Sequence, residues 1–265
     1  MVSKKLFVKK KVFILGGNGF IGSELVTYFK HYNYDVFSIT RKNYKKFVKK
    51  KCNLFINANG NSRKYFASKY PIDDFKLNVI GTINSVFDFK YDKYVFLSSI
   101  DVYGNFNKKT STKEKTKINK NTLSYYGFTK KISEELIQKY TEKYLILRLG
   151  GVLGKNLKKN PIFDISNNKK LFVHPKSKFS FISTYDIFNF ILKTEKINNE
   201  IFNVSGEGTL TISDVIKFFN YNKNVSNKLP VFNYLIDIQK TKKIFNLKKS
   251  NYYFKEFANQ LNQAL

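Results

Sequence analysis

The stretch KVFILGGNGFIG, residues 11–22, places four large apolar residues directly before three glycines spaced three apart. The apolar run predicts a buried strand, and residues 20–29 predict an amphipathic helix. Gly16, Gly19 and Gly22 then lie at a strand-to-helix junction. The first glycine permits a tight turn, the second lets the backbone approach a pyrophosphate, and the third lets the helix pack against the strand. The helix amides point at the phosphates. The pattern favours a dinucleotide site over a plain turn with a packing glycine.

Strand-like and helix-like segments alternate after this turn. The expected strands are 35–40, 53–57, 94–97 and 144–147, and the expected helices are 71–89 and 124–140. Such alternation predicts an α/β fold of the Rossmann type, a doubly wound parallel sheet with helices on both faces. After residue 150 the alternation weakens. There we expect a mixed segment at 151–183, a helix at 184–194, a strand at 201–204, a helix at 213–219 and a short helical cap at 229–265.

The end of the second strand bears on which dinucleotide binds. An NAD site usually places an acid there, about 20 residues after the glycines, to bond the ribose 2′-hydroxyl. Here the strand ends in Ser38-Ile39-Thr40-Arg41-Lys42, with no acid. The Arg41 guanidinium can donate two parallel hydrogen bonds to a 2′-phosphate. NADP(H) is therefore favoured and NAD(H) stays possible, because Arg41 and Lys42 could also be ordinary loop charges.

Two further stretches suggest the reacting groups: LSSIDVYG, residues 97–104, and YYGFTKK, residues 125–131. Tyr126 and Lys130 lie one helical turn apart on one face. Ser99, at a strand end, can meet them at the carboxyl edge of the sheet. In hydride transfer, Tyr126 would exchange a proton with the substrate oxygen, Lys130 would lower the tyrosine pKa, and Ser99 would hydrogen-bond the same oxygen. An isolated Tyr-x-x-x-Lys match is weak in a chain with 18 tyrosines, so the conjunction carries the prediction.

The composition of the chain indicates which partners and which cell compartment to expect. The net charge of +29 invites a nucleic-acid partner. However, the lysines scatter along the chain, and only three of the 48 basic residues are arginine, so a solvated surface is favoured and nucleic acid is not expected.

Cys52 is the only cysteine. The apolar runs are too short for a membrane span, and the lysine-rich N-terminus lacks signal-peptide features, so we expect a cytoplasmic protein. His31 and His174 lack partners at metal-ligand spacing, so no metal is expected.

As a set, seven stretches resemble the extended short-chain dehydrogenase/reductase family, which comprises nucleotide-sugar epimerases, dehydratases and reductases. They are GGNGFIG (16–22), NANG (57–60), NVIGT (78–82), SSIDVYG (98–104), YGFTK (126–130), LRLGGVLG (147–154) and NVSGEG (203–208). The resemblance implies a Rossmann domain over 1–150 plus about 184–204, and a small substrate-binding lobe over 151–183 and 205–265. It also implies a homodimer formed through the helices at 73–89 and 124–140.

The resemblance further implies most of the expected site residues, and Thr40, Arg41 and Arg63 are added from their places in the sequence. Ser99, Tyr126 and Lys130 would be catalytic. Cofactor contacts would come from Gly16, Asn18, Gly19, Phe20, Ile21, Gly22, Thr40, Arg41, Asn57, Ala58, Asn59, Gly60, Asn78, Tyr126 and Lys130. A nucleotide-sugar substrate would lie near Arg63, Asp101 and Arg148. Arg63 could equally be a surface charge. Asp101 stands near the position where the dehydratases carry a glutamate, and it could instead form hydrogen bonds within its loop.

The sequence also departs from the family pattern. Only 12 positions lead from Arg41 to Asn53, where the family usually fits a further strand and helix, so the adenine pocket must be abbreviated. Gly150 and Gly151 stand where many relatives carry an asparagine near the nucleotide-sugar. Three hypotheses remain: an NADPH-dependent reductase of a keto group on a nucleotide-activated sugar, a nucleotide-sugar epimerase or dehydratase holding NAD tightly, and a non-catalytic dinucleotide- or RNA-binding protein.

Overall fold

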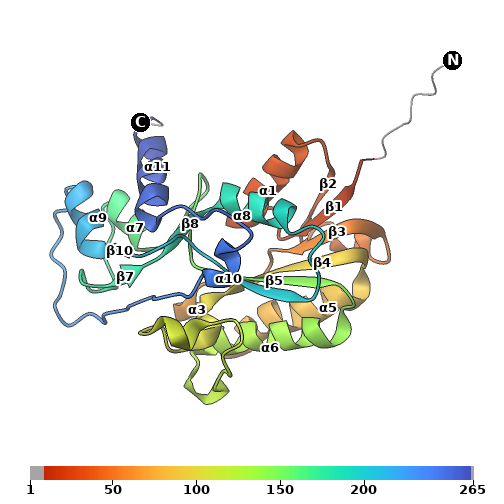
Figure 1. Cartoon of the computed structure of the whole chain (residues 1–265), viewed down its shortest axis with the longest axis horizontal. Coiled ribbons are helices and arrows are strands. Elements are labelled where there is room, and N and C mark those ends of the chain that lie inside the picture. Colours follow the sequence, from red (N-terminus) through yellow and green to blue (C-terminus); the bar gives the residue numbers. More distant parts are fainter. Residues whose placement is uncertain (1–8, 264–265) are drawn as a thin grey trace.

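The computed structural model describes residues 9–263 and is built on one six-stranded parallel sheet (Figure 1). The N-terminal segment whose composition argued against export lies mostly outside the described residues. In spatial order the strands are β2 (Asp35–Ile39), β1 (Lys11–Leu15), β3 (Lys51–Asn57), β4 (Lys90–Ser99), β5 (Tyr144–Leu149) and β9 (Glu200–Val204). Every neighbouring pair is parallel. This confirms the predicted fold class.

Helices cover both faces of the sheet, as Figure 1 shows. On one face lie α1 (Phe20–His31) and α8 (Thr184–Lys193), which pack against each other. On the other lie α5 (Gly81–Asp88) and α6 (Tyr125–Tyr140). Alternate side chains of β1 serve the two cores: Val12 and Ile14 join the cluster under α1, and Phe13 joins the second cluster. Burial on both faces explains why the strands read as continuous apolar runs.

The connection between β2 and β3 is unusually short. It holds only α2 (Tyr44–Phe47), a single helical turn. Within residues 9–263 no strand lies beyond β2, so β2 forms the edge of the sheet. The strand order consequently reverses at β1, with β2 on one side and β3 on the other. In open α/β sheets ligands bind at this switch point, outside the carboxyl ends of the strands. The glycine turn follows β1 directly.

The helix expected at 71–89 is continuous but not uniform. It runs through α4 (Pro71–Phe75), a π-helical turn (Lys76–Ile80) and α5. Pro71 occupies the first position of α4, where its missing N–H costs nothing. The π-helical turn contains Asn78, one of the predicted site residues. Such turns are rare and often occur at functional sites.

Apart from α8 and β9, the chain after residue 150 forms smaller units beside the main sheet, most of them at one end of the molecule (Figure 1). Its elements are β6 (Gly151–Leu153) paired with β8 (Phe181–Ser183), β7 (Lys178–Phe179) paired with β10 (Leu210–Thr211), α7 (Pro161–Ser166), α9 (Ile212–Phe218), α10 (Gln239–Lys242) and α11 (Ser250–Asn262). The predicted helical cap at 229–265 is only partly helical, because residues 229–238 run without helix and Asn233 bridges to Lys178.

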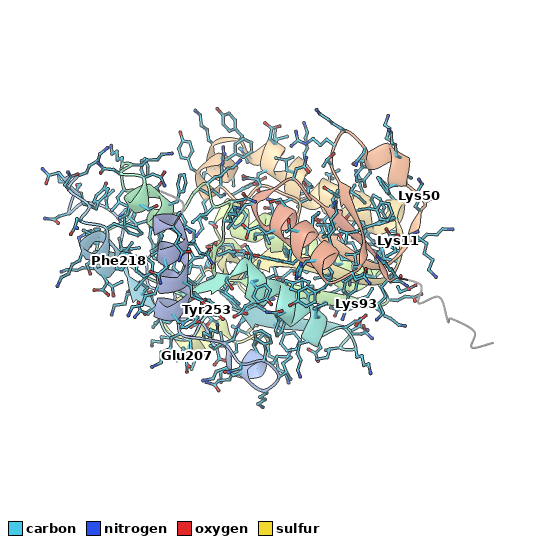
Figure 2. The ribbon with its side chains drawn as sticks, turned by 90° about the horizontal axis from the view of Figure 1, so that it is seen from above. Lys11, Lys50, Lys93, Glu207, Phe218 and Tyr253 are labelled. Atoms are coloured by element: carbon cyan, nitrogen blue, oxygen red, sulfur yellow. The ribbon has the colours of Figure 1, made fainter. Side chains whose placement is uncertain are left out.

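The basic side chains that the structure describes are not gathered on one helix, strand or patch of the surface (Figure 2). In Figure 2 side chains that end in nitrogen project around the whole outline, and the labelled Lys11 and Lys50 lie at the opposite end from Phe218. Across residues 9–263, no helix has both the length and the apolar character needed to span a membrane.

Candidate active site

The glycine turn after β1 is close-packed backbone. Gly16 has φ +80°, and a Cβ there would lie 2.9 Å from the backbone of Ala58. A Cβ on Gly22 would lie 2.3 Å from the Gly16 carbonyl oxygen, so α1 can approach the strand only with glycine at this position. Gly19 precedes α1, and no side chain caps the helix there. The first-turn amides therefore lack a side-chain acceptor, and the helix dipole favours an anion at this end. The turn fits a dinucleotide phosphate.

The loop after β2 is ordered by Asn43. The Thr40 amide donates to Asn43 Oδ1 at 2.7 Å, and Asn43 Nδ2 donates to the Ser38 carbonyl at 2.9 Å. Ser38 Oγ also donates to Asn18 Oδ1 at 3.2 Å, which joins this loop to the glycine turn. Arg41 is exposed, and no carboxylate of the described chain pairs with it. Its guanidinium therefore remains available to a ligand.

The segment after β3 packs closely against the π-helical turn. Asn57 Nδ2 donates to the buried Tyr94 hydroxyl at 2.8 Å, and its Oδ1 accepts from the Asn59 amide at 3.0 Å. Gly60 has φ +119°, and a Cβ there would lie 2.3 Å from Asn78 Oδ1. In residues 9–263 that oxygen is the only buried side-chain polar atom without a hydrogen-bond partner. Asn78 Oδ1 is thus a buried, unpaired acceptor beside a glycine that has no side chain. A ligand bound here could supply the missing hydrogen-bond donor.

Ser99 is the last residue of β4, and Tyr126 lies in the first turn of α6. Ser124 caps α6, since its side chain accepts from the Gly127 amide at 3.1 Å. Gly127 carries no side chain, and a Cβ there would lie 2.3 Å from the Asp101 carbonyl oxygen. This contact brings the start of α6 against the 3₁₀ turn at Ile100–Tyr103 that follows Ser99. Ser99 and Tyr126 are both buried.

The sequence predicts that Lys130 lowers the pKa of Tyr126, but the surroundings of Tyr126 raise its pKa above the ordinary value. Burial is the main cause, and the negative charge of Asp101 adds to it. A hydrogen bond with Ser99 and the positive charge of Lys64 act in the opposite direction. In the protein alone, Tyr126 is therefore a protonated phenol, which is the form that donates a proton to an oxygen.

Lys130 points from α6 toward the sheet. Its ammonium donates to the Leu97 carbonyl at 3.2 Å and lies 4.7 Å from the centre of the Phe96 ring. The Cβ position of Gly60 is 3.6 Å from the same nitrogen. Burial lowers the pKa of Lys130 to about 8, although the charges of Asp74 and Glu134 oppose this. Lys130 thus stands between the end of β4 and the glycine-containing segment after β3.

Asp74 is a wholly buried carboxylate behind these groups. Its Oδ1 accepts from Asn61 at 2.6 Å and Asn78 at 3.0 Å, and its Oδ2 accepts from Thr129 at 2.7 Å. One side chain therefore joins the loop after β3, the π-helical turn and α6 next to Lys130. Such a carboxylate is retained in a core only when donors satisfy its oxygens.

The predicted substrate residues have different surroundings. Arg63 is exposed at the start of α3 (Lys64–Lys69). Asp101 is buried beside Ser99, where its Oδ2 accepts from the Ser99 hydroxyl at 3.2 Å and its Oδ1 lies 2.5 Å from the Lys64 ammonium. Arg148 lies in the core. The structure therefore brings Asp101, but not Arg148, against Ser99.

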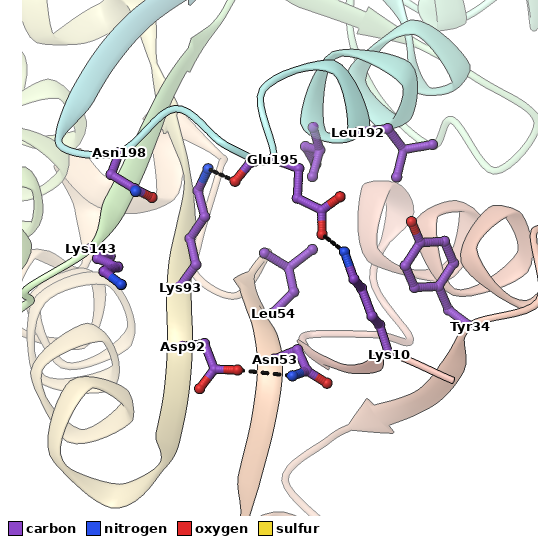
Figure 3. Close-up of a pocket in the computed structure, with 11 residues that line it drawn as sticks. Lys10, Tyr34, Asn53, Leu54, Asp92, Lys93, Lys143, Leu192, Glu195 and Asn198 are labelled. Atoms are coloured by element: carbon purple, nitrogen blue, oxygen red, sulfur yellow. Dashed lines mark hydrogen bonds and ion pairs between the residues drawn. The ribbon is translucent and has the colours of Figure 1, made fainter. Parts of the chain in front are cut away.

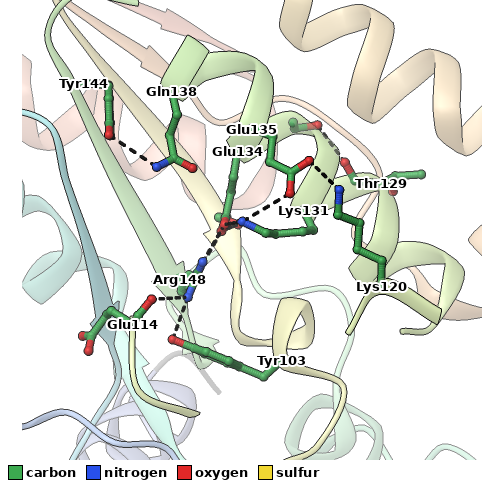
Figure 4. A network of polar contacts seen from close by, with 12 residues as sticks. Tyr103, Glu114, Lys120, Thr129, Lys131, Glu134, Glu135, Gln138, Tyr144 and Arg148 are labelled. Carbon is green, nitrogen blue, oxygen red and sulfur yellow. Dashed lines mark hydrogen bonds and ion pairs between the residues drawn. The ribbon is translucent and has the colours of Figure 1, made fainter. Parts of the chain in front are cut away.

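Figure 4 shows the network that holds Arg148. Its Nε and Nη2 donate to the two oxygens of Glu134 at 3.0 and 2.7 Å, and its Nη1 donates to the Tyr103 hydroxyl at 2.8 Å. Both members of the ion pair are almost fully buried. Burial raises the pKa of Glu134, but the charge and hydrogen bonds of Arg148 outweigh it, so the pKa lies below its ordinary value. This pair ties α6 to β5.

Four residues near the site were not anticipated from sequence: Lys64, Asp74, Lys159 and Tyr234. Lys159 Nζ donates to Ser62 Oγ at 2.7 Å, and burial lowers the pKa of Lys159 to about 8, helped by the charges of Arg63 and Lys130. In a lysine-rich chain nothing distinguishes Lys64 or Lys159 from a surface lysine. Asp74 follows Pro71 in the first turn of a helix, where acids are ordinary.

One hollow lies at the opposite edge of the sheet from the glycine turn. It has a volume of about 260 Å³ and is lined by residues that begin strands, among them Asn53, Asp92 and Lys93 (Figure 3). Lys93 donates to backbone carbonyls that follow α8, including that of Thr194 at 2.7 Å. This hollow is not at the carboxyl edge where parallel sheets bind ligands. Among residues 9–263, no three His, Cys, Asp or Glu side chains gather so that they could hold a metal ion.

Fold and site together define a Rossmann-type α/β protein with serine, tyrosine and lysine side chains at the carboxyl edge of its sheet. The model of the NAD dependent epimerase/dehydratase family matches residues 12–167, more than half of the chain, so the chain belongs to this family. This confirms the resemblance found in the sequence motifs. A comparison with curated proteins found no match.

Solved structures with the same fold include both epimerases and reductases. A UDP-galactose 4-epimerase is 21% identical, with a TM-score of 0.77 over 96% of this chain and 99% of that one. A dTDP-4-dehydrorhamnose reductase from Bacillus anthracis str. Ames, in complex with NADP, is 17% identical, with a TM-score of 0.76 over the same shares. MoeE5, in complex with UDP-glucose and NAD, is 14% identical, with a TM-score of 0.81 over 96% of this chain and 100% of that one.

Proposed function

We propose that this protein is an NADPH-dependent reductase that acts on a keto group of a nucleotide-activated sugar. The features that support the proposal are the burial of Ser99 and Tyr126 where β4 ends and α6 begins, Lys130 one turn further along α6, and the glycine turn at the same edge of the sheet. Bound NADPH supplies a hydride to the carbonyl carbon. The similar structures support this class, since one is a reductase in complex with NADP and others hold NAD with UDP-sugars.

Tyr126 and Ser99 would act on the substrate oxygen. Tyr126 is protonated in the protein alone and donates its proton to the oxygen as negative charge develops there. The Ser99 hydroxyl donates a hydrogen bond to the same oxygen and polarises the carbonyl. Both side chains are buried, so their electrostatic effect on the oxygen is little screened by water.

Lys130 would stabilise the tyrosine phenolate that remains after proton transfer. Lys130 is buried, and in the protein alone its ammonium donates a hydrogen bond to the Leu97 carbonyl. This bond holds the ammonium close to β4. A positive charge near a phenol favours the ionised form. The buried Asp74 favours the charged form of Lys130 in turn.

Arg41 supports NADPH over NADH. The guanidinium follows β2, is exposed, and has no carboxylate partner among the residues that the structure describes. The loop that carries it is fixed by Asn43 and joined to the glycine turn through Ser38 and Asn18. An arginine fork in this position matches a 2′-phosphate and leaves the 2′-hydroxyl of NADH without an acidic acceptor.

We also propose that the protein forms a homodimer through α5 and α6. Large apolar side chains are exposed on both helices, Phe87 of α5 at 57% and Tyr140 of α6 at 47%, and Ile80, directly before α5, is exposed at 42%. The Phe87 and Tyr140 rings lie 5.4 Å apart, so the two helices present one apolar area. Exposed apolar patches of this kind mark interaction sites on soluble proteins.

The reaction is tested by mixing the purified protein with NADPH and 4-keto-sugar nucleotides carrying UDP or dTDP. The proposal predicts that NADPH is consumed in proportion to product. An epimerase would instead copurify with NAD(H) and convert the sugar nucleotide without net consumption of cofactor. Salt-sensitive RNA binding that is unchanged in Tyr126→Phe, with no turnover of any sugar nucleotide, would favour a non-catalytic protein.

A further inference from the structure

Lys64 connects three parts of the candidate site. It is the first residue of α3, in the segment that follows the predicted cofactor contacts at Asn57–Gly60. Its ammonium lies 2.5 Å from Asp101 Oδ1 and also donates to the Tyr234 hydroxyl. The same nitrogen lies 4.9 Å from the centre of the Tyr234 ring. The β3 side of the site, the catalytic serine loop and the C-terminal part of the chain therefore meet at one side chain.

Asp101 places a negative charge directly against the catalytic serine. Its side chain is 11% exposed. Its Oδ2 accepts from Ser99 Oγ at 3.2 Å, its Oδ1 accepts from the Tyr234 hydroxyl at 3.2 Å, and its amide donates to Ser99 Oγ at 3.2 Å. A nearly buried carboxylate requires a compensating charge. Within residues 9–263, Lys64 is the one cation within 4 Å of it.

Tyr234 fixes the Lys64 ammonium from the other side. The Tyr234 ring is stacked between Phe106, at 4.3 Å, and Phe179, at 5.1 Å, and the residue is buried. Its position is therefore set by the packing of the C-terminal part of the chain. The Lys64 side chain is 47% exposed over its whole length, so polar contacts at its ammonium, and not packing of its carbon chain, fix its position.

We propose that Lys64 is a positioning residue for the catalytic pair: it holds the Asp101 carboxylate against Ser99 and cancels a negative charge beside the Tyr126 phenol. The inference rests on the proposed function, in which Tyr126 exchanges the proton. Without Lys64, the negative charge of Asp101 would destabilise the Tyr126 phenolate that must form during the reaction. Without Asp101, the positive charge of Lys64 would stabilise that phenolate.

The charges that face Tyr126 agree with this assignment. Burial raises its pKa most, and the charges of Asp101 and Asp74 raise it further, while the Ser99 hydrogen bond and the charge of Lys64 lower it. Lys130 is a further ammonium near the end of β4. Burial lowers the pKa of Lys64, but Asp101 and Tyr234 outweigh it, so the pKa lies above its ordinary value and the residue stays charged at neutral pH.

The test is a direct titration of residue 126 in the full chain without cofactor or substrate. Replacing Tyr126 with 3,5-difluorotyrosine lowers the intrinsic phenol pKa into an accessible range, and ¹⁹F NMR follows its ionisation. The labelled protein is compared with Lys64→Met, Asp101→Asn and the double variant. Lys69→Met, which removes an exposed cation from the same helix, is the matched control. Lys64→Arg keeps the charge.

The expected result is a compensating pattern. Lys64→Met raises the pKa of the fluorinated phenol by about one pH unit, Asp101→Asn lowers it by a similar amount, and the double variant returns close to the parent. Lys69→Met and Lys64→Arg leave it within a few tenths of a unit. A Lys64→Met shift no larger than that of Lys69→Met, or a double variant displaced as far as Lys64→Met, would overturn the proposal.

Two further readouts separate possible failures. If Lys64→Met does not fold, Asp101→Asn alone decides, because an unchanged or raised phenol pKa in that variant contradicts the proposed charge balance. The titration needs no turnover, so a protein that shows the compensating pattern but reduces no keto-sugar nucleotide would refute the proposed function and leave the role of Lys64 intact.

Discussion

Arg41 is the residue on which the proposed cofactor preference depends. Replacing it with serine removes a charge-assisted fork, an interaction of about 1.5–3 kcal/mol. We therefore expect Arg41→Ser to weaken NADPH binding by roughly 10- to 100-fold and to change NADH binding little. Fluorescence titration of both reduced cofactors measures this. Lys42→Ser, at the neighbouring exposed cation, is the control. Tighter binding of NADH than NADPH by the unaltered protein would reverse the assignment.

Lys130 gives a pH prediction at the same scale. Burial lowers its pKa to about 8, so its ammonium is charged below that pH and neutral above it. Because the charged form stabilises the phenolate of Tyr126, kcat/KM for reduction should fall as the pH rises through about 8. A pH profile of kcat/KM, which reports groups of the free enzyme, measures this. A kcat/KM that keeps rising from pH 8 to 10 would contradict the role of Lys130.

At residue level the sequence indicates which groups could react but not which charges surround them. Tyr126 and Lys130 follow from helical periodicity, and the glycine turn from local backbone requirements. Lys64 and Asp101 are 37 positions apart in the numbering, and no periodic pattern links them. Arg148 was expected near the substrate, and nothing local shows that Glu134 pairs with it in the core. Such partners are set by tertiary packing.

At the level of elements, the Glu134–Arg148 pair joins α6 to β5. Glu134→Gln leaves a buried guanidinium without its counter-charge, which costs on the order of 3–5 kcal/mol in the free energy of unfolding. Chemical denaturation measures the loss. Glu135→Gln is the control, since that neighbouring carboxylate is 41% exposed and its ion pairs contribute about 1 kcal/mol or less. Equal losses in the two variants would contradict the assigned role of the pair.

The stabilisation by Glu134 should depend on pH in one direction. Its pKa in the folded protein lies below its ordinary value of 4.5. A depressed pKa contributes stability above the unfolded value, and this is lost as the pH falls through the folded value. The difference between the parent and Glu134→Gln in the free energy of unfolding should therefore be full near pH 6 and shrink progressively below about pH 4.5.

The regular elements were largely predictable because apolar periodicity decides them. All six strands of the main sheet contain or coincide with runs seen in the sequence, and α6 begins after its capping Ser124. The π-helical turn at Lys76–Ile80 was not predictable, since it preserves the apolar pattern of a helix. Residues 229–238 were expected to be helical but instead pass beside the main site, held by Tyr234 and a bridge to β7.

At the level of the whole molecule, the proposed dimer depends on the apolar area of α5 and α6. Placing a charge there should dissociate it, because a buried unpaired carboxylate is costly. We expect Phe87→Glu to convert the dimer to a monomer in sedimentation equilibrium. Phe172→Glu, at a side chain 66% exposed outside both helices, should leave the oligomeric state unchanged. A parent protein that is monomeric at all concentrations would refute the proposed interface.

The central claim is that hydride is transferred at the site formed by Ser99, Tyr126 and Lys130, and isotope transfer tests it most directly. The protein is incubated with NADPH deuterated at the transferred position of the nicotinamide and with a 4-keto-sugar nucleotide, and the product is analysed by mass spectrometry. The account predicts one deuterium per product molecule, with the rate reduced about 100- to 10,000-fold in Tyr126→Phe while cofactor binding is retained. Undiminished deuterium transfer in Tyr126→Phe would contradict it.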